Sequence, residues 1–150
     1  MKLEEEIKQQ KPFRNEAERL TVNILFTAAW LQSFHRDFLK PHDISGPQYN
    51  ILRILRGQFP KPATINLLKE RMLDKMPDVS RLVDRLLIKG FVTRVTCSND
   101  RRAVDIVISA TGLTLLQTID EQWHTADTSL AALSDDEKKQ LNLLLDKLRG

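Results

Sequence analysis

This chain has one cysteine, Cys97, in 150 residues, so no disulfide can form within it. No apolar run approaches the ~18 residues that a membrane-spanning helix needs. The first six residues are acidic and polar, which is not typical of a signal peptide. These absences exclude a disulfide-stapled scaffold, and they favour a cytoplasmic protein without a membrane partner.

Patterns typical of catalysis and metal binding are also missing. No group of His, Cys and Asp residues has metal-ligand spacing. No Gly-rich phosphate loop and no nucleophile elbow is present. We therefore expect no enzyme activity, no cofactor and no metal. We interpret Cys97, which lies on a predicted strand, as a small hydrophobic residue rather than a redox group.

What is present suits one soluble domain. The hydrophobic fraction is 41% and the charged fraction 29%, which are ordinary values for a globular protein. A chain of 150 residues can bury a core without disulfides. We expect a single domain over residues 1–150, mainly helical with one small β-hairpin (α+β).

Long helices are predicted at both ends of the chain, after a loose stretch up to Pro12. The first runs from about residue 15 to 40, because side chains recur along one seam at steps of three and four: Leu20, Ile24, Thr27, Leu31, Phe34 and Phe38. Another begins at Ser109 or Thr111 and runs to about Leu130. A final helix follows the capping-box sequence that starts at Ser134.

The middle of the chain predicts a helix-turn-helix. Ser45-Gly46-Pro47 opens a helix that Gly57 ends, and Thr64 is a plausible N-cap for a helix over residues 65–73. After a tight turn at residues 74–76, a second helix is expected from Met76 to Lys89, with Pro77 in its first turn and Gly90 after its end.

A β-hairpin is predicted directly after this helix. Residues 91–97 and 103–108 are β-branched and alternating, and a polar tip separates them. The tip carries Arg101 and Arg102. A helix-turn-helix followed by a two-stranded wing suits DNA, because the second helix fits a major groove and the wing can reach an adjacent minor groove.

The charge distribution agrees with this interpretation. The net charge is +3, but residues 69–102 carry nine Lys and Arg against five Asp and Glu. Residues 103–150 carry four against eight. The positive excess therefore coincides with the predicted DNA-reading segment, whereas the C-terminal helices are acidic.

Four sequence blocks in this order resemble the MarR (multiple antibiotic resistance regulator) family of bacterial transcription factors. The blocks are Ser80–Leu86, Lys89–Val92, Asn99–Ala103 and Ser109–Gly112. The resemblance covers roughly residues 14–149. It implies a winged-helix homodimer on a palindrome, with dimerisation helices at 14–40 and 113–149 and a DNA-binding lobe at 46–110. It also implies a response to a small phenolic or carboxylic effector.

The resemblance implies that the second helix, the turn before it and the wing contact double-stranded DNA. The candidate DNA-binding residues are Lys75, Asp78, Ser80, Arg81, Arg85, Arg101 and Arg102. Two of them have alternatives. Asp78 would repel phosphate unless it reads a cytosine amino group or caps the helix, and Arg85 could pair with Asp84 or with another carboxylate.

Effector binding has weaker candidates on the first long helix. Trp30, Phe34 and His35 lie close together there. The family has a pocket between the dimer helices and the second helix of the helix-turn-helix, which we call the reading helix. An aromatic set at helical spacing is more often core than a binding pocket. The sequence also leaves open a winged-helix module for protein–protein contact without DNA, although the wing Arg pair argues against it.

Overall fold

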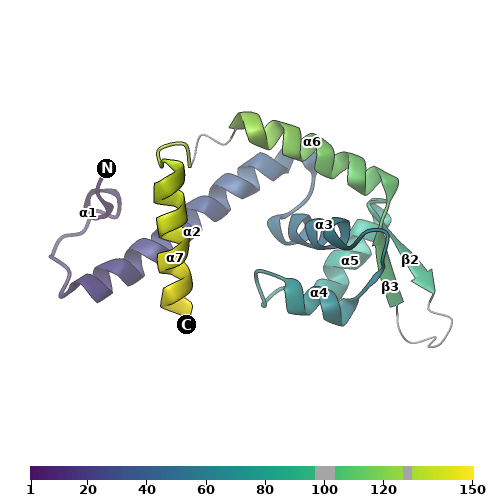
Figure 1. The fold of residues 1–150 in the computed structure, drawn as a ribbon, viewed down its shortest axis with the longest axis horizontal. Helices are drawn as coiled ribbons and strands as arrows, with labels where there is room; N and C mark the ends of the chain where they lie inside the picture. Colours follow the sequence, from purple (N-terminus) through teal and green to yellow (C-terminus); the bar gives the residue numbers. More distant parts are fainter. Residues whose placement is uncertain (97–103, 127–129) are drawn as a thin grey trace.

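The computed structural model describes residues 1–96, 104–126 and 130–150, except the side chains of residues 104 and 124–126 (Figure 1). Its elements are α1 (Leu3–Glu6), α2 (Glu16–Leu39), the short 3-10 helix η1 (Lys40–His42), α3 (Gly46–Gln58), β1 (Ala63–Thr64), α4 (Ile65–Arg71), α5 (Val79–Ile88), β2 (Val92–Thr96), β3 (Val104–Ile108), α6 (Ala110–Ala126) and α7 (Asp135–Arg149).

The helix starts follow the predicted capping residues. The Ser45 hydroxyl accepts a hydrogen bond from the Gln48 backbone N–H at 3.2 Å, and the Gln48 side chain accepts one from the Ser45 N–H in return. The Thr64 hydroxyl accepts from the Leu67 N–H at 3.1 Å at the start of α4. Each cap satisfies a backbone donor that has no partner within its helix, so these short sequences fix where the helices begin.

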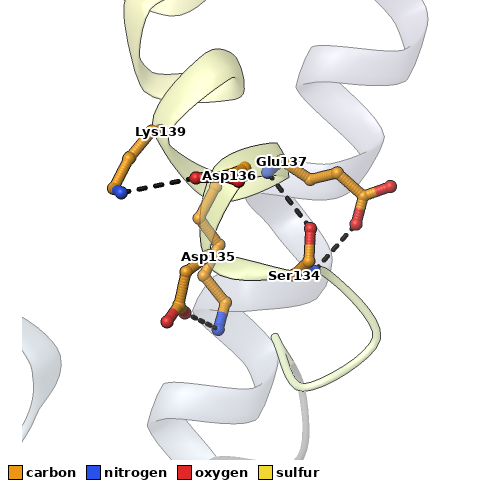
Figure 2. Close-up of polar contacts among 6 residues, drawn as sticks. Ser134, Asp135, Asp136, Glu137 and Lys139 are labelled. Carbon is orange, nitrogen blue, oxygen red and sulfur yellow. Dashed lines mark hydrogen bonds and ion pairs between the residues drawn. The ribbon is translucent and has the colours of Figure 1, made fainter.

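The predicted capping box at the last helix is confirmed as well (Figure 2). The Glu137 carboxylate accepts a hydrogen bond from the Ser134 N–H at 2.8 Å, and the Ser134 hydroxyl accepts one from the Glu137 N–H at 3.3 Å. These hydrogen bonds lower the pKa of the Glu137 carboxyl because they favour its charged form.

The predicted hairpin is part of a three-stranded antiparallel sheet with the order β1-β3-β2. Thr93 pairs with Val107 between β2 and β3, and Ala63 pairs with Ile106 between β1 and β3. The sequence prediction missed β1, because its two residues are too short to show alternation. The sheet therefore includes the residues directly before α4, which connects the hairpin to the helix-turn-helix.

The core lies in the lobe formed by α3, α4, α5 and the sheet, together with the first half of α6. Its fully buried large side chains are Leu39, Ile51, Leu52, Leu55, Leu68, Leu86, Ile106, Leu116, Ile119, Val83 and Val92. Figure 1 shows these elements gathered at one end of the molecule. The helix-turn-helix and the sheet thus rest on one continuous apolar cluster.

The outer helices bury much less. No residue of α7 is buried, and in α2 only Leu39 is. On α7, Leu143 is 70% exposed and Leu144 57% exposed. Within a single chain the apolar seam of α2 is therefore only half covered, and most leucines of α7 are exposed.

Three predicted boundaries are wrong. The loose N-terminal stretch contains α1, whose Leu3 is buried and whose Glu4 forms an ion pair with Arg19 of α2 at 2.6 Å. The reading helix begins at Val79 instead of Met76, so Pro77 lies in the turn. Helix α4 ends at Arg71 instead of residue 73. The predicted end of the next long helix near Leu130 follows residues 127–129, which lie outside the described residues.

A tight joint connects the end of α5 to the start of α6. The Ser109 N–H donates to the Phe91 carbonyl at 3.0 Å, and the Ser109 hydroxyl donates to the Gly90 carbonyl at 2.6 Å. A Cβ at Gly112 would lie 2.3 Å from the Phe91 carbonyl oxygen. Only glycine fits there, which gives a physical reason for the glycine in the Ser109–Gly112 block.

Candidate nucleic-acid interface

The reading helix α5 has two distinct faces. It buries Val79, Val83 and Leu86 against the lobe core. The opposite face is exposed and carries Ser80, Arg81, Asp84 and Arg85. An exposed polar helix face of this size, held by a rigid core behind it, can enter a DNA major groove.

Asp78 is the N-cap of this helix. Its carboxylate accepts a hydrogen bond from the Arg81 N–H at 3.3 Å, and it lies 3.7 Å from the Arg81 guanidinium. Of the two roles that the sequence left open for Asp78, the structure therefore supports the capping role. The same carboxylate partly neutralises Arg81, so an approaching phosphate or base must compete with it.

Lys75 points back at the protein. Its ammonium donates to the backbone carbonyls of Lys69 and Glu70, in the last turn of α4. These carbonyls lack helical partners, and a cation there also interacts favourably with the helix dipole. Lys75 therefore stabilises the turn in this conformation, and it would have to leave these carbonyls to reach DNA.

Arg85 makes no ion pair with any residue that the structure describes. The neighbouring Asp84 pairs instead with Arg94 of β2, with an oxygen–nitrogen distance of 2.8 Å. The predicted alternative of an Arg85–Asp84 pair is therefore not what the structure shows. Arg85 keeps its guanidinium available to an anion.

The Asp84–Arg94 pair was not predicted, because the partners lie on different elements. It links the exposed face of α5 to the start of the wing. The wing-tip candidates Arg101 and Arg102 lie outside the described residues, as does Cys97. Their roles remain predictions.

The turn also presents an apolar surface that sequence reasoning missed. Met76 is 90% exposed and Leu73 is 87% exposed, immediately before the reading helix. The Met76 N–H donates to the Asp74 carboxylate at 2.9 Å, which fixes the turn. Exposed apolar side chains beside a major-groove helix can contact thymine methyl groups.

The effector candidates separate into two places. Phe34 and His35 of α2 meet Trp123 of α6, with ring centroids 5.8 Å and 4.8 Å from the Trp123 ring. Phe38 lies closest to Trp123, at 4.7 Å and nearly perpendicular. Edge-to-face geometry of this kind is favourable between aromatic rings. The cluster joins a predicted dimerisation helix to the helix that continues from the wing.

Trp30 lies apart from this aromatic cluster. It lines a pocket of about 610 Å³ between α1 and α2, together with Phe26, Arg19 and Met1. The sequence placed Trp30 with Phe34 and His35 because the three are close along one helix. The structure shows that they face different neighbours, so they do not form one site.

The aromatic cluster affects one titratable group. Burial against the rings lowers the pKa of the His35 imidazole, because desolvation disfavours its charged form. Nearby, the His42 Nε2 and the Gln122 Oε1 are 2.8 Å apart. No group of three His, Cys, Asp or Glu residues in the described part of the chain could hold a metal ion.

A search of the described helices found none long and apolar enough to cross a membrane. The expected fold, mainly helical with a small antiparallel sheet after a helix-turn-helix, is confirmed by the element order. It is also the fold of several solved transcription regulators.

Residues 42–103 match the sequence model of the MarR family. A MarR-like transcription regulator from Bacillus cereus has a TM-score of 0.79 at 20% identity, over 89% of this chain and 96% of that one. A cysteine-to-serine variant of Escherichia coli MarR, solved with operator DNA, has a TM-score of 0.77 at 24% identity, over 92% and 99%. A MarR transcription factor from Planctomyces limnophilus has a TM-score of 0.70 at 26% identity, over 90% and 98%.

Proposed function

Because residues 42–103 match the MarR family and the fold is that of solved MarR regulators, we propose that this chain is a MarR-family regulator. It binds double-stranded DNA sequence-specifically and represses transcription as a homodimer on a palindromic operator. The observation that carries this proposal is the exposed polar face of α5, with Ser80, Arg81 and Arg85 opposite the buried face.

Arg81 and Ser80 are proposed to read base edges, since both lie in the first turn of α5. Guanidinium can donate two hydrogen bonds to guanine O6 and N7, a fork that lysine cannot copy. Arg85 and the wing residues Arg101 and Arg102 are proposed to hold phosphates. Lys75 and Asp78 then act mainly by setting the turn and the helix start.

Selection of bound genomic fragments, followed by binding measurements over a range of salt concentrations, tests this proposal. Arg81→Lys should lose ~1–3 kcal/mol of discrimination per half-site while non-specific binding stays nearly constant. Arg53→Lys, an exposed arginine on α3 whose guanidinium lies 5.8 Å from the Tyr49 ring centroid, is the matched control. Absence of salt-dependent DNA binding would favour the alternative of a protein–protein contact module.

The homodimer is supported by the open apolar seams of α2 and α7. Leu20 of the α2 seam is 50% exposed and Leu25, outside that seam, is 66% exposed. Four leucines of α7 are similarly open: Leu141, Leu143, Leu144 and Leu148. Monomeric proteins rarely expose such stripes, and a two-fold axis would bury both copies of each seam. Sedimentation that shows only a 17.3 kDa species at micromolar concentration would contradict the dimer.

We also propose a small phenolic or carboxylic effector beside the Trp123 cluster. An aromatic ring could stack against Phe34, and His35 could donate to a carboxylate. The variant Trp30→Phe leaves Trp123 as the single tryptophan, so a hydroxybenzoate titration that quenches its fluorescence reports binding there. His35→Phe in the same background should weaken the quenching; an equal response in both proteins would exclude His35.

A further inference from the structure

A second pocket lies beside the start of α3. Its volume is about 340 Å³, and its walls come from the end of α2, η1, the start of α3 and the end of α5. We call it the cation pocket. It is lined by Arg36, Lys40, Asp43, Ile44, Ser45, Gln48, Arg85 and Lys89.

The charges in the cation pocket are unbalanced. Four cations face one carboxylate, that of Asp43, which is already 3.2 Å from the Lys89 ammonium. Arg36, Lys40 and Arg85 have no carboxylate within ion-pair distance among the described residues. Arg36 uses one nitrogen to donate to the Ser33 hydroxyl at 2.9 Å, which holds it in place. The pocket therefore has a surplus of positive charge that an anion can neutralise.

A neutral donor completes the wall. The Gln48 side chain is only 5% exposed, and its oxygen is fixed by the Ser45 N–H at 2.9 Å. The amide nitrogen of Gln48 donates to no residue of the described chain. This nitrogen is not fully buried, so a ligand can reach it. It is thus held in a fixed orientation and available to a ligand in the pocket. An acceptor in the pocket could therefore take a hydrogen bond from this nitrogen in place of solvent.

We propose that the cation pocket binds a phosphate-type oxyanion. Tetrahedral oxygens can accept from arginine, lysine and amide donors on several sides, which matches the mixed donors of this wall. The anion is either a free phosphate or a phosphodiester of the DNA backbone. The second source rests on the proposed DNA binding, whereas the first does not.

The location of the pocket matters in the same way for a free phosphate and for a DNA phosphodiester. Arg36 belongs to α2 and Lys40 to η1, whereas Arg85 and Lys89 belong to the reading helix and its C-cap. One oxyanion between them would attract both groups and fix the spacing between the long helix and the reading helix. A ligand in the cation pocket would therefore influence the position of the C-terminal end of the reading helix.

Two variants of the full chain test the site. Arg36→Gln with Lys40→Gln removes two cations outside the proposed reading face. Gln48→Glu keeps the oxygen that accepts from the Ser45 N–H but replaces the free donor with a negative charge. Arg53→Gln with Lys61→Gln removes the same charge outside the pocket and serves as the control.

Inorganic phosphate is titrated against chloride at equal ionic strength, and melting temperature and heat of binding are measured without DNA. The free-oxyanion source predicts that phosphate, but not chloride, raises the melting temperature of the wild type and of the control. Both pocket variants should lose this rise. Affinity for selected DNA is then measured against salt. A severalfold loss in the pocket variants, with the salt slope reduced by about 0.9 per lost contact, identifies a backbone phosphate.

The proposal is overturned if phosphate stabilises neither the wild type nor the control, and if the pocket variants bind DNA with the same affinity as the control. A wild type that binds no DNA at all would contradict the proposed function instead, because the phosphate titration still decides the pocket. Circular dichroism of each variant shows whether Gln48→Glu folds; if it does not, the double variant carries the same comparison.

Discussion

The winged-helix lobe and the outer helices differ in how they use their apolar residues. In the lobe, Leu52 of α3 is 0% exposed, whereas Leu144 of α7 is 57% exposed. Both are leucines on amphipathic helices with clear apolar stripes. The difference shows that the lobe can stabilise itself, while α7 and much of α2 present surfaces that a single chain does not cover.

The largest expected effect separates these two leucines. Leu52→Ala should lower the free energy of unfolding by about 2–5 kcal/mol, because it leaves a cavity in the lobe core. Leu144→Ala should leave the isolated chain almost unchanged and weaken self-association instead. Urea unfolding at two protein concentrations distinguishes them, because only the Leu144 effect should depend on concentration. If both variants lost the same free energy of unfolding at both protein concentrations, the difference between the lobe and the outer helices would be contradicted.

The joint between α5 and α6 gives the next effect. Gly112→Ala should destabilise the lobe by about 1–3 kcal/mol, because the new Cβ would overlap the Phe91 carbonyl oxygen, which must move. Gly57→Ala, near the end of α3, has nothing within 4 Å of its Cβ and should be neutral or stabilising. Thermal melts of both variants test this; a neutral Gly112→Ala would mean that the joint is loose.

The cap of the reading helix gives a smaller effect. Asp78→Ala should cost about 1 kcal/mol, because the Arg81 N–H loses its acceptor. Asp78→Asn should retain this stability, since asparagine also caps well, and should strengthen non-specific DNA binding by removing a negative charge. Denaturation and DNA titration on the same samples separate the two roles. Equal stability of all three proteins would exclude the cap.

The smallest effect concerns pH and the outer helices. Burial lowers the pKa of folded His35, so the unfolded chain binds the proton more readily near pH 6.5. Stability should therefore fall as the pH drops through about 6.5 and level off below the lowered folded pKa. The melting temperature of His35→Phe should fall less between about pH 7.5 and about pH 5.5. If the melting temperatures of the wild type and His35→Phe fell by the same amount over this pH range, His35 would not contribute to the pH dependence.

The sequence predicted the elements whose causes are local. Ser45, Thr64 and Ser134 mark helix starts because a cap acts within one turn. Alternation predicted β2 and β3 for the same reason. The start of α5 was placed three residues early because Pro77 suits a first turn, whereas the cap is Asp78. Here two local rules competed, and the hydrogen bond to the Arg81 N–H decided between them.

The missed features depend on contacts between distant segments. The contacts of Trp123 with Phe34 and His35 require α6 to lie beside α2. Strand β1 needs β3 as a partner. Nothing in the sequence singles out Arg94, because its ion pair with Asp84 forms only when β2 packs beside α5. Periodicity assigns a residue to a face, but it does not say which other face it meets.

The joint at Gly112 makes α6 a lever. From Ser109 to Trp123 the helix spans about 21 Å, at about 1.5 Å per residue. A displacement of about 2 Å at the Trp123 end therefore corresponds to a rotation of only about 5° at the joint. Because Ser109 is hydrogen-bonded to the Gly90 and Phe91 carbonyls, that rotation turns the end of α5 with it. Since Leu116 and Ile119 of α6 are buried in the lobe core, a small shift between the long helices would change the angle of the whole lobe, and of the reading helix with it.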